Sequence, residues 1–278
     1  NPVDVKTRMG RGVAGRLKDI RPLILGWDIS GVVEAVSPDV TQFKPGDAVF
    51  GMVNFPGLGS AYAEYVAAPA AHLALKPDNI SFEAAAVTTL APLTAYQVLH
   101  THYHLPANQR VLIHAAAGGV GHFAIQMAKL AGAYVVGTTS AHNHDFVRSL
   151  GADEVIDYKT QRLEDATSNI DFVLDTIGGD TFNRSLKVMK PGSTIVSIAG
   201  PLPEEAAEKA KALGIHASFQ QVVSNGKDMQ ALADLLAQGK LQPCISATFA
   251  FEDMGKAHLQ IESGHTIGKV VVKLERPF

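Results

Sequence analysis

Short apolar runs in the first ninety residues give way to a regular alternation of strand-like and helix-like segments. In the first part, runs such as 31–36 and 48–50 are separated by turns rich in proline, glycine and aspartate, which is typical of β-rich structure. The Ala-rich segment 84–99 lacks strand alternation and predicts helix. Ser81 precedes it as a weak cap, because the acid of a capping box, Glu83, stands one position too early. We therefore expect a domain boundary near residue 90.

Beyond residue 90, runs rich in valine and isoleucine predict strands that are buried on both faces, with helices between them. We expect strands at 111–114, 134–137, 155–156, 172–174 and 194–197, and helices at 118–130, 145–150 and 229–238. After Pro243 a strand, a helix over 252–263 and a strand over 270–272 follow. The alternation predicts an α/β domain with a doubly wound parallel sheet.

The sharpest local signal is the segment 111–121, a predicted strand, a glycine-rich turn and the start of a helix. Gly118 and Gly119 allow the backbone, with Ala117, to approach a pyrophosphate closely. A helix that begins near Val120 offers free N–H groups, and Gly121 permits tight packing of helix on strand. A tight turn without a ligand is the alternative, but the predicted strand and helix favour dinucleotide binding.

The residues after the second strand of this domain select the cofactor. Enzymes that prefer NAD place Asp or Glu there to bind the ribose hydroxyls. Here the segment 137–143 reads GTTSAHN, without an acid, and Thr139 and Ser140 offer hydroxyl groups. His142, His144 and Arg148 follow and can add positive charge, although for each histidine alone a solvated loop is the more common explanation. The sequence therefore predicts NADP(H) rather than NAD(H).

Composition narrows the partners and the metal chemistry. The 278 residues include 24 Lys and Arg and 27 Asp and Glu, a net charge of −3 that argues against nucleic acid or an anionic membrane as partner. With 46% hydrophobic residues the chain can bury a large core. The single cysteine, Cys244, excludes disulfides within the chain and zinc sites built on two thiolates. The start of the chain shows no secretory signal and no segment suits a membrane span, so we expect a cytoplasmic protein.

Several motifs together resemble one protein family. The chain is similar to zinc-independent members of the medium-chain dehydrogenase/reductase superfamily, in the group of quinone oxidoreductases and enone (alkenal) reductases. The matching stretches span nearly the whole chain: NPVDVK at 1–6 with Arg8 and Gly10, GWDISGVV at 26–33, FKPGDAV at 43–49, AEY at 63–65, LTAY at 93–96, the turn at 118–121, LGADEVIDY at 150–158 and GHTIGK at 264–269.

The resemblance implies a GroES-like catalytic domain at 1–90, a Rossmann domain that binds NADP(H) at 91–242, and a return segment at 243–278 that completes the catalytic domain. It also implies a longer lead-in, with the first strands of the catalytic domain, ahead of Asn1. Tyr158 would lie near the adenosine 2′-phosphate, Asp175 under the nicotinamide ribose, and Ile198 and Ala199 beside the nicotinamide. Relatives pair the edges of their cofactor domains, so the resemblance implies a homodimer.

The same resemblance implies a site without a catalytic metal ion. Where zinc-dependent members have Gly-His-Glu, this chain has Gly26, Trp27 and Asp28, so no catalytic zinc is expected. Hydride transfer then requires a small, electron-poor acceptor, a quinone or an α,β-unsaturated carbonyl, whose developing negative charge a hydrogen-bond donor can stabilise. The candidate donors are Asn1, Lys6 and Tyr62, with Tyr96 as a weaker one that more commonly belongs to a core.

Other functions stay open. A trans-2-enoyl thioester reductase would need a long acyl channel and a positioned tyrosine, and a non-catalytic NADPH-binding sensor or scaffold would use the same fold. The alternating histidines at 100, 102 and 104 can attract a metal, but a plain connecting turn is the more common explanation. Cys244 is expected as a buried small residue rather than a nucleophile.

Overall fold

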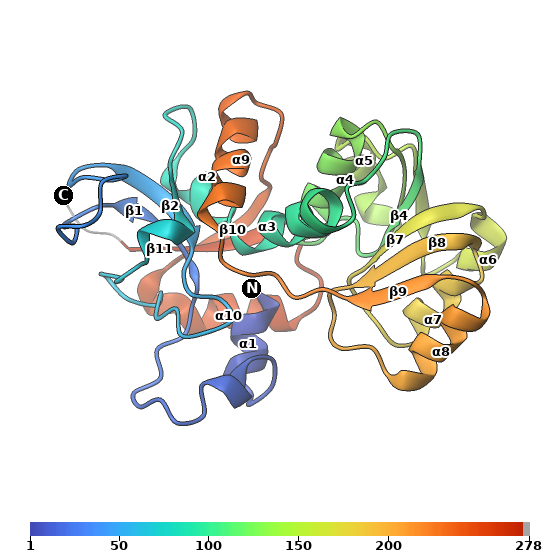
Figure 1. Ribbon diagram of the computed structural model, residues 1–278, viewed down its shortest axis with the longest axis horizontal. Coiled ribbons are helices and arrows are strands. Elements are labelled where there is room, and N and C mark those ends of the chain that lie inside the picture. Colours follow the sequence, from blue (N-terminus) through green and yellow to red (C-terminus); the bar gives the residue numbers. More distant parts are fainter. Residues whose placement is uncertain (275–278) are drawn as a thin grey trace. The chain divides into compact units, whose positions relative to one another are not determined.

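The computed structural model describes residues 1–274 and divides into two compact units (Figure 1). The first unit comprises residues 1–93 and the chain from residue 222 onward, and the second comprises 94–221. We call them the GroES-like unit and the Rossmann unit. The chain passes from the first unit into the second within α3 (Leu90–Tyr96) and then forms a π-helical turn, η3 (Gln97–His102).

The Rossmann unit is built on a six-stranded parallel sheet with the strand order β6-β5-β4-β7-β8-β9. The strands are β4 (Arg110–Ile113), β5 (Tyr134–Thr139), β6 (Glu154–Asp157), β7 (Ile170–Asp175), β8 (Met189–Ser197) and β9 (His216–Phe219). The helices between them are α4 (Gly121–Leu130), η4 (Ala141–Asn143), α5 (His144–Ser149), α6 (Leu163–Ala166), α7 (Asp180–Leu186) and α8 (Glu204–Ala212). The parallel, doubly wound sheet that the sequence predicts is therefore confirmed.

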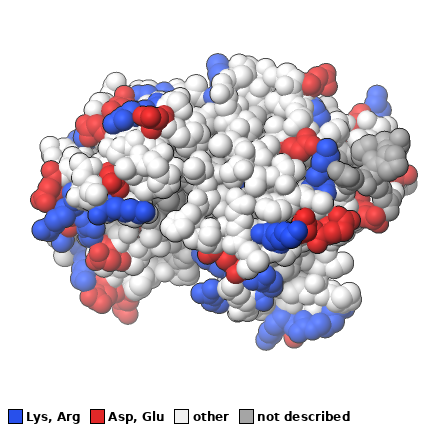
Figure 2. All heavy atoms as spheres, turned by 180° about the vertical axis from the view of Figure 1, so that it is seen from behind, with Lys and Arg blue, Asp and Glu red and all other residues white. Residues whose placement is uncertain are grey.

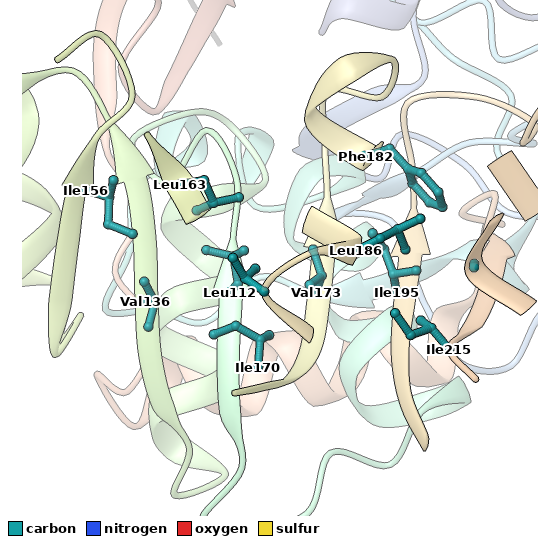
Figure 3. Packing of buried hydrophobic residues seen from close by; sticks show 12 residues of the cluster. Leu112, Val136, Ile156, Leu163, Ile170, Val173, Phe182, Leu186, Ile195 and Ile215 are labelled. Carbon is teal, nitrogen blue, oxygen red and sulfur yellow. The ribbon is translucent and has the colours of Figure 1, made fainter. Parts of the chain in front are cut away.

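One face of this sheet carries an apolar core that Figure 3 shows from close by. Leu112, Val173 and Ile195 project from neighbouring strands toward Phe182 and Leu186 of α7. All five are nearly or fully buried, and burying each such side chain stabilises the fold by roughly 1.5–3 kcal/mol. Helices α6 and α8 also contribute residues to this cluster, whereas Figure 1 shows α4 and α5 on the opposite side of the sheet.

The GroES-like unit contains two small sheets. Strands β1 (Asp28–Val32), β2 (Ala48–Met52) and β3 (Leu73–Leu75) form an antiparallel sheet, and β10 (Ile245–Ala250) pairs in parallel with β11 (Lys269–Lys273). The helices are α1 (Pro2–Arg8), η1 (Ala14–Arg16), η2 (Ala70–His72), α2 (Phe82–Ala86), α9 (Gly226–Ala237), η5 (Phe251–Asp253) and α10 (Met254–Glu262). Its core includes Trp27, which meets Phe55 edge to face at 5.3 Å.

The division differs from the expected one at its second boundary. Helix α9 was expected in the nucleotide-binding segment 91–242, but it lies in the GroES-like unit with β3 and η2. The Asn79 side chain donates to the carbonyl of Leu236 at 3.2 Å, and an added Cβ at Gly226 would lie 2.6 Å from the carbonyl oxygen of Ala71. Long-range packing of this kind leaves no trace in local periodicity.

Two local predictions also need correction. The apolar run 31–36 is a strand only through Val32, although the N–H of Val33 still donates to the carbonyl of Asp47 and the N–H of Gly46 donates to the carbonyl of Val33. Ser81 is a working cap, since its Oγ accepts from the backbone N–H of Ala84 at 3.1 Å without help from an acid at the third position.

Candidate functional site

The carboxyl ends of the parallel strands gather most of the predicted cofactor residues at one edge of the Rossmann sheet. The strand order changes direction between β4 and β7, and open parallel sheets bind ligands beyond the strand ends at such a switch point. The predicted residues follow these ends in turn: Ala117, Gly118, Gly119, Val120 and Gly121 after β4, Thr139 and Ser140 at the end of β5, Tyr158 after β6, Asp175 at the end of β7, and Ile198 and Ala199 after β8.

The glycine-rich turn after β4 is tightly folded. The N–H of Gly118 bonds to the carbonyl of Ala115 at 2.8 Å, and Ala115 itself has a positive φ of 45°. A Cβ added to Gly121 would stand 2.3 Å from the carbonyl oxygen of Ala115 and 2.8 Å from the Cα of Ala116. Helix α4 can therefore start against the strand only with glycine at this position. The N–H groups at the start of a helix are the usual donors to a pyrophosphate.

The end of β5 offers hydroxyl groups and no carboxylate. Ser140 is 6% exposed, and its Oγ lies 3.2 Å from Nδ1 of His142 and 3.4 Å from Nδ2 of Asn143. Tyr158 is 54% exposed and its backbone N–H bonds to the carbonyl of Thr139 at 3.3 Å, so the tyrosine stands next to the end of β5. Hydroxyl groups without a carboxylate at this position fit a 2′-phosphate better than the free ribose hydroxyls of NAD(H).

A cavity of about 330 Å³ opens at the ends of β7 and β8. Asp175, Ser197 and Ala199 line it, and Asp175 is fully buried. Its Oδ1 accepts from the backbone N–H groups of Ile177 and Gly178 at 3.1 and 2.9 Å, while Oδ2 has no hydrogen-bond partner within residues 1–274. A buried acceptor without a partner fits a ligand that brings hydroxyl donors, as a ribose does.

His114, which the sequence analysis did not single out, connects three elements at this edge of the sheet through hydrogen bonds. Its Nδ1 lies 3.0 Å from the Thr138 hydroxyl and its Nε2 lies 2.7 Å from the Ser185 hydroxyl. Since Ser185 donates its own hydrogen to the carbonyl of Thr181, we assign the ring proton to Nε2. Burial lowers the pKa of His114 to about 4, so the ring is neutral at pH 7 and fixes β4, β5 and α7 together.

In the GroES-like unit, a second cavity of about 120 Å³ brings Asn1 and Tyr62 together with residues the sequence analysis did not assign. The carboxamide of Asn1 donates to Asp28 at 2.6 Å and accepts from Nζ of Lys269. Lys269 is 6% exposed, and burial lowers its pKa while the nearby Asp28 and Asp4 carboxylates raise it. Both ends of the Asn1 carboxamide are thus engaged within the protein.

Tyr62 is engaged in the same way. Its hydroxyl lies 2.9 Å from Nε2 of His258, a residue of α10 that is 6% exposed. Burial and the Asp4 carboxylate raise the pKa of Tyr62 far above its usual value, so the phenol keeps its proton. Burial lowers the pKa of His258, and the Nδ1 of this ring is a buried atom without a hydrogen-bond partner in the described chain.

Lys6 lies apart from this cavity. It is exposed on α1, and its ammonium group has no hydrogen bond or ion pair with another residue of 1–274. Among the three predicted donors, the structure therefore gathers Asn1 and Tyr62 into one internal network and leaves Lys6 available to a ligand.

The position that holds a zinc-binding histidine in metal-dependent members is filled by Trp27. The indole is buried and donates to the carbonyl of Gly57 at 2.7 Å. Among the residues that the structure describes, no three His, Cys, Asp or Glu side chains stand close enough to hold a metal ion. Nε2 of His102, one of the alternating histidines, instead lies 2.9 Å from Nε2 of Gln220. Burial raises the pKa of the Cys244 thiol.

Comparison with known proteins places the chain in a family. Residues 1–78 match the alcohol dehydrogenase GroES-like domain, and residues 150–272 match the family of zinc-binding dehydrogenases. The human mitochondrial NAD(P)H oxidoreductase RTN4IP1 is 33% identical over 99% of this chain and 79% of its own length. The chloroplastic NADPH-dependent alkenal/one oxidoreductase of Arabidopsis thaliana is 35% identical over 98% of this chain and 69% of its own length.

Solved structures agree with these relatives. The quinone oxidoreductase from Coxiella burnetii has 38% identity and a TM-score of 0.93, covering 99% of this chain and 87% of that one. The Escherichia coli quinone oxidoreductase, solved with NADPH, has 27% identity and a TM-score of 0.84, covering 98% and 88%. The fold and the relatives together define an oxidoreductase class. The chain belongs to the medium-chain dehydrogenase/reductase superfamily, where its relatives are quinone and alkenal/one oxidoreductases.

Proposed function

We propose that this protein is an NADPH-dependent reductase that transfers hydride, without a metal ion, to a quinone or to the β-carbon of an α,β-unsaturated carbonyl. The observation that carries the proposal is the end of β5, where hydroxyl groups and no carboxylate stand beside the glycine-rich turn. The names of the relatives support NADP(H) as the cofactor and a small, electron-poor molecule as the acceptor.

The residues of the Rossmann unit account for binding. Gly118 would let the pyrophosphate approach the backbone, and the N–H groups of Gly119 and Val120 at the start of α4 would bind it. Ser140 and Tyr158 would lie at the 2′-phosphate, and Oδ2 of Asp175 would accept from the nicotinamide ribose. When bound, NADPH supplies the hydride, and the protein orients the acceptor against it and excludes water. Ile198 and Ala199 border the nicotinamide in this arrangement.

Lys6 is the best candidate for the group that stabilises charge on the acceptor. When hydride arrives, negative charge develops on the carbonyl oxygen, and a nearby ammonium group can donate a hydrogen bond and then a proton to it. The side-chain polar atoms of Asn1 and Tyr62 already form hydrogen bonds with Asp28, Lys269 and His258. We therefore assign charge stabilisation to Lys6 on the exposed side of α1, and we give Asn1 and Tyr62 a structural role within their own cavity.

The direct test follows NADPH oxidation with a panel of 1,4-quinones, short alkenals, enones and trans-2-enoyl thioesters. We expect turnover with quinones or enones. Turnover confined to the thioesters would instead favour an enoyl reductase, the function named for one structural neighbour with 27% identity. Tight NADPH binding without reduction of any acceptor would favour a sensor or scaffold and contradict the proposal.

Lys6→Met tests the assignment of the donor. We expect kcat/KM to fall about 100-fold with NADPH binding unchanged, because a charged donor acts on the transition state. Lys18→Met, at another exposed lysine of the same unit, is the matched control and should leave kcat/KM unchanged. Equal activity of the two variants would remove Lys6 from the mechanism.

Location and assembly stay predictions. No helix in residues 1–274 has the length and apolar character needed to span a bilayer. Several relatives are named mitochondrial or chloroplastic. The proposed homodimer is checked by the solution mass of the purified protein. On the face that Figure 2 shows, Lys and Arg stand among Asp and Glu.

A further inference from the structure

The end of β5 carries an unusual set of groups for a phosphate site. Between residues 137 and 144 there is no Lys or Arg, and the side chains that can become positive are His142 and His144. Arginine and lysine hold their charge at every physiological pH, whereas an imidazole gains or loses its proton between about pH 5 and 8. A 2′-phosphate that depends on these histidines is bound with an affinity that depends on pH.

The two histidines have different surroundings. His142 is exposed, and its Nδ1 lies 3.2 Å from Oγ of Ser140. His144 begins α5 and stands near the Asp157 carboxylate, whose pKa is lowered first by the backbone N–H of Lys159 and further by the His144 charge. A charge on His144 is therefore offset by Asp157, while a charge on His142 is available to a ligand at Ser140.

Three other charged groups lie on the neighbouring segments. Asp145 and Arg148 of α5 pair with each other at 3.8 Å, with side chains 105% and 57% exposed. Lys159 follows Tyr158 after β6 and is exposed, so it adds a constant positive charge near the same edge. Carboxylate, guanidinium and ammonium groups keep their charge near neutral pH, so the groups of variable charge here are the two imidazoles, of which His142 is the one beside Ser140.

We propose that His142, together with Ser140, makes the preference for NADPH over NADH dependent on pH. This inference rests on the proposed function, because it assumes that the 2′-phosphate binds at the end of β5. A phosphate beside an imidazole favours the protonated, positively charged ring. Binding of NADPH is therefore linked to proton uptake, and NADPH affinity falls as the pH rises. NADH lacks the phosphate and its affinity stays constant.

The test measures the dissociation constants of NADPH and NADH for the full chain by calorimetry at pH 6.5 and 8.5. From pH 6.5 to pH 8.5 we expect the dissociation constant of NADPH to rise about fivefold and that of NADH to stay the same. Proton uptake on NADPH binding should make the measured binding heat depend on the ionisation heat of the buffer. His142→Gln should abolish the change with pH, and His142→Lys should keep tight NADPH binding at both values. His265→Gln, at an exposed histidine of the GroES-like unit, is the matched control and should behave as the wild type.

The outcomes separate the two proposals. NADPH binding that does not vary with pH in the wild type, or that varies equally in His142→Gln, would overturn the role of His142 while leaving the proposed function in place. Failure of both dinucleotides to bind would overturn the proposed function and this inference with it.

Discussion

The two units of this protein build their sites in different ways. In the Rossmann unit the site follows from topology: parallel strands end at one edge, and small residues and backbone N–H groups stand there. In the GroES-like unit the cavity is lined by charged and titratable side chains that are themselves buried, among them Asp4, His258 and Lys269. The first kind of site tolerates many side chains but few backbone changes, and the second depends on each polar partner.

The largest expected effect is in the Rossmann unit. Gly121→Val would drive a side chain into the backbone of Ala115 and Ala116, which cannot move aside as a flexible side chain does. We expect a loss of about 4 kcal/mol in the free energy of unfolding, at the upper end for overpacking, and loss of NADPH binding. Gly200→Ala is the control, because a Cβ there meets nothing within 4 Å. Denaturant unfolding and calorimetry measure both.

The comparable break in the GroES-like unit is Lys269→Met. It keeps most of the side-chain volume but leaves the buried Asn1 carboxamide oxygen without its donor. Leaving a buried acceptor unsatisfied destabilises by roughly 1–3 kcal/mol. Lys273→Met on the same strand removes an exposed lysine that faces Glu83 at 3.2 Å and should change stability by less than about 0.5 kcal/mol. Equal stabilities of the two variants in urea would contradict a working charge network.

A smaller effect sharpens the comparison, because the Rossmann unit also buries titratable groups, among them His114. The pKa of His114 is lowered to about 4, whereas in the unfolded chain an imidazole takes up its proton near pH 6.5. The unfolded chain thus binds the extra proton first, so this contribution to stability is present above pH 6.5 and is lost as the pH falls toward 4. We expect a loss of about 2 kcal/mol between pH 7 and 5, absent from His114→Asn. Urea unfolding of both proteins at the two pH values measures it, and parallel pH profiles would contradict the assignment.

Sequence patterns predicted the Rossmann unit well because its elements are locally marked. The strand β4, the glycine turn and α4 follow each other without a gap, so periodicity and turn chemistry agree. Helices α6, α7 and α8 and strand β9 were missed. Helix α8 is mostly polar, with Ala210 as its buried residue, and β9 is a four-residue strand at the edge of the sheet. Short or polar elements depend on the neighbours they pack against.

The network in the GroES-like unit was beyond local patterns. Tyr62 and His258 are 196 residues apart, and Lys269 and Asn1 are 268 apart. His258 lies in an ordinary amphipathic helix and Lys269 at the start of an apolar strand, and nothing in either context marks the side chain as buried. Lys269 ends the segment 264–269, which resembles the family. That resemblance indicated where Lys269 lies in the chain but not which residues it contacts.

The central claim is that the end of β5 holds the 2′-phosphate of NADPH, and Ser140→Asp tests it most directly. The variant places a carboxylate where the account puts the phosphate and recreates the acid that NAD-binding proteins use. Dissociation constants for NADPH and NADH are measured by calorimetry for the wild type and the variant, with Ser149→Asp on α5 as the control. We predict that Ser140→Asp weakens NADPH binding about 30-fold while NADH binding is unchanged or tighter, since like charges repel at close range. An unchanged ratio of the two constants would contradict the account.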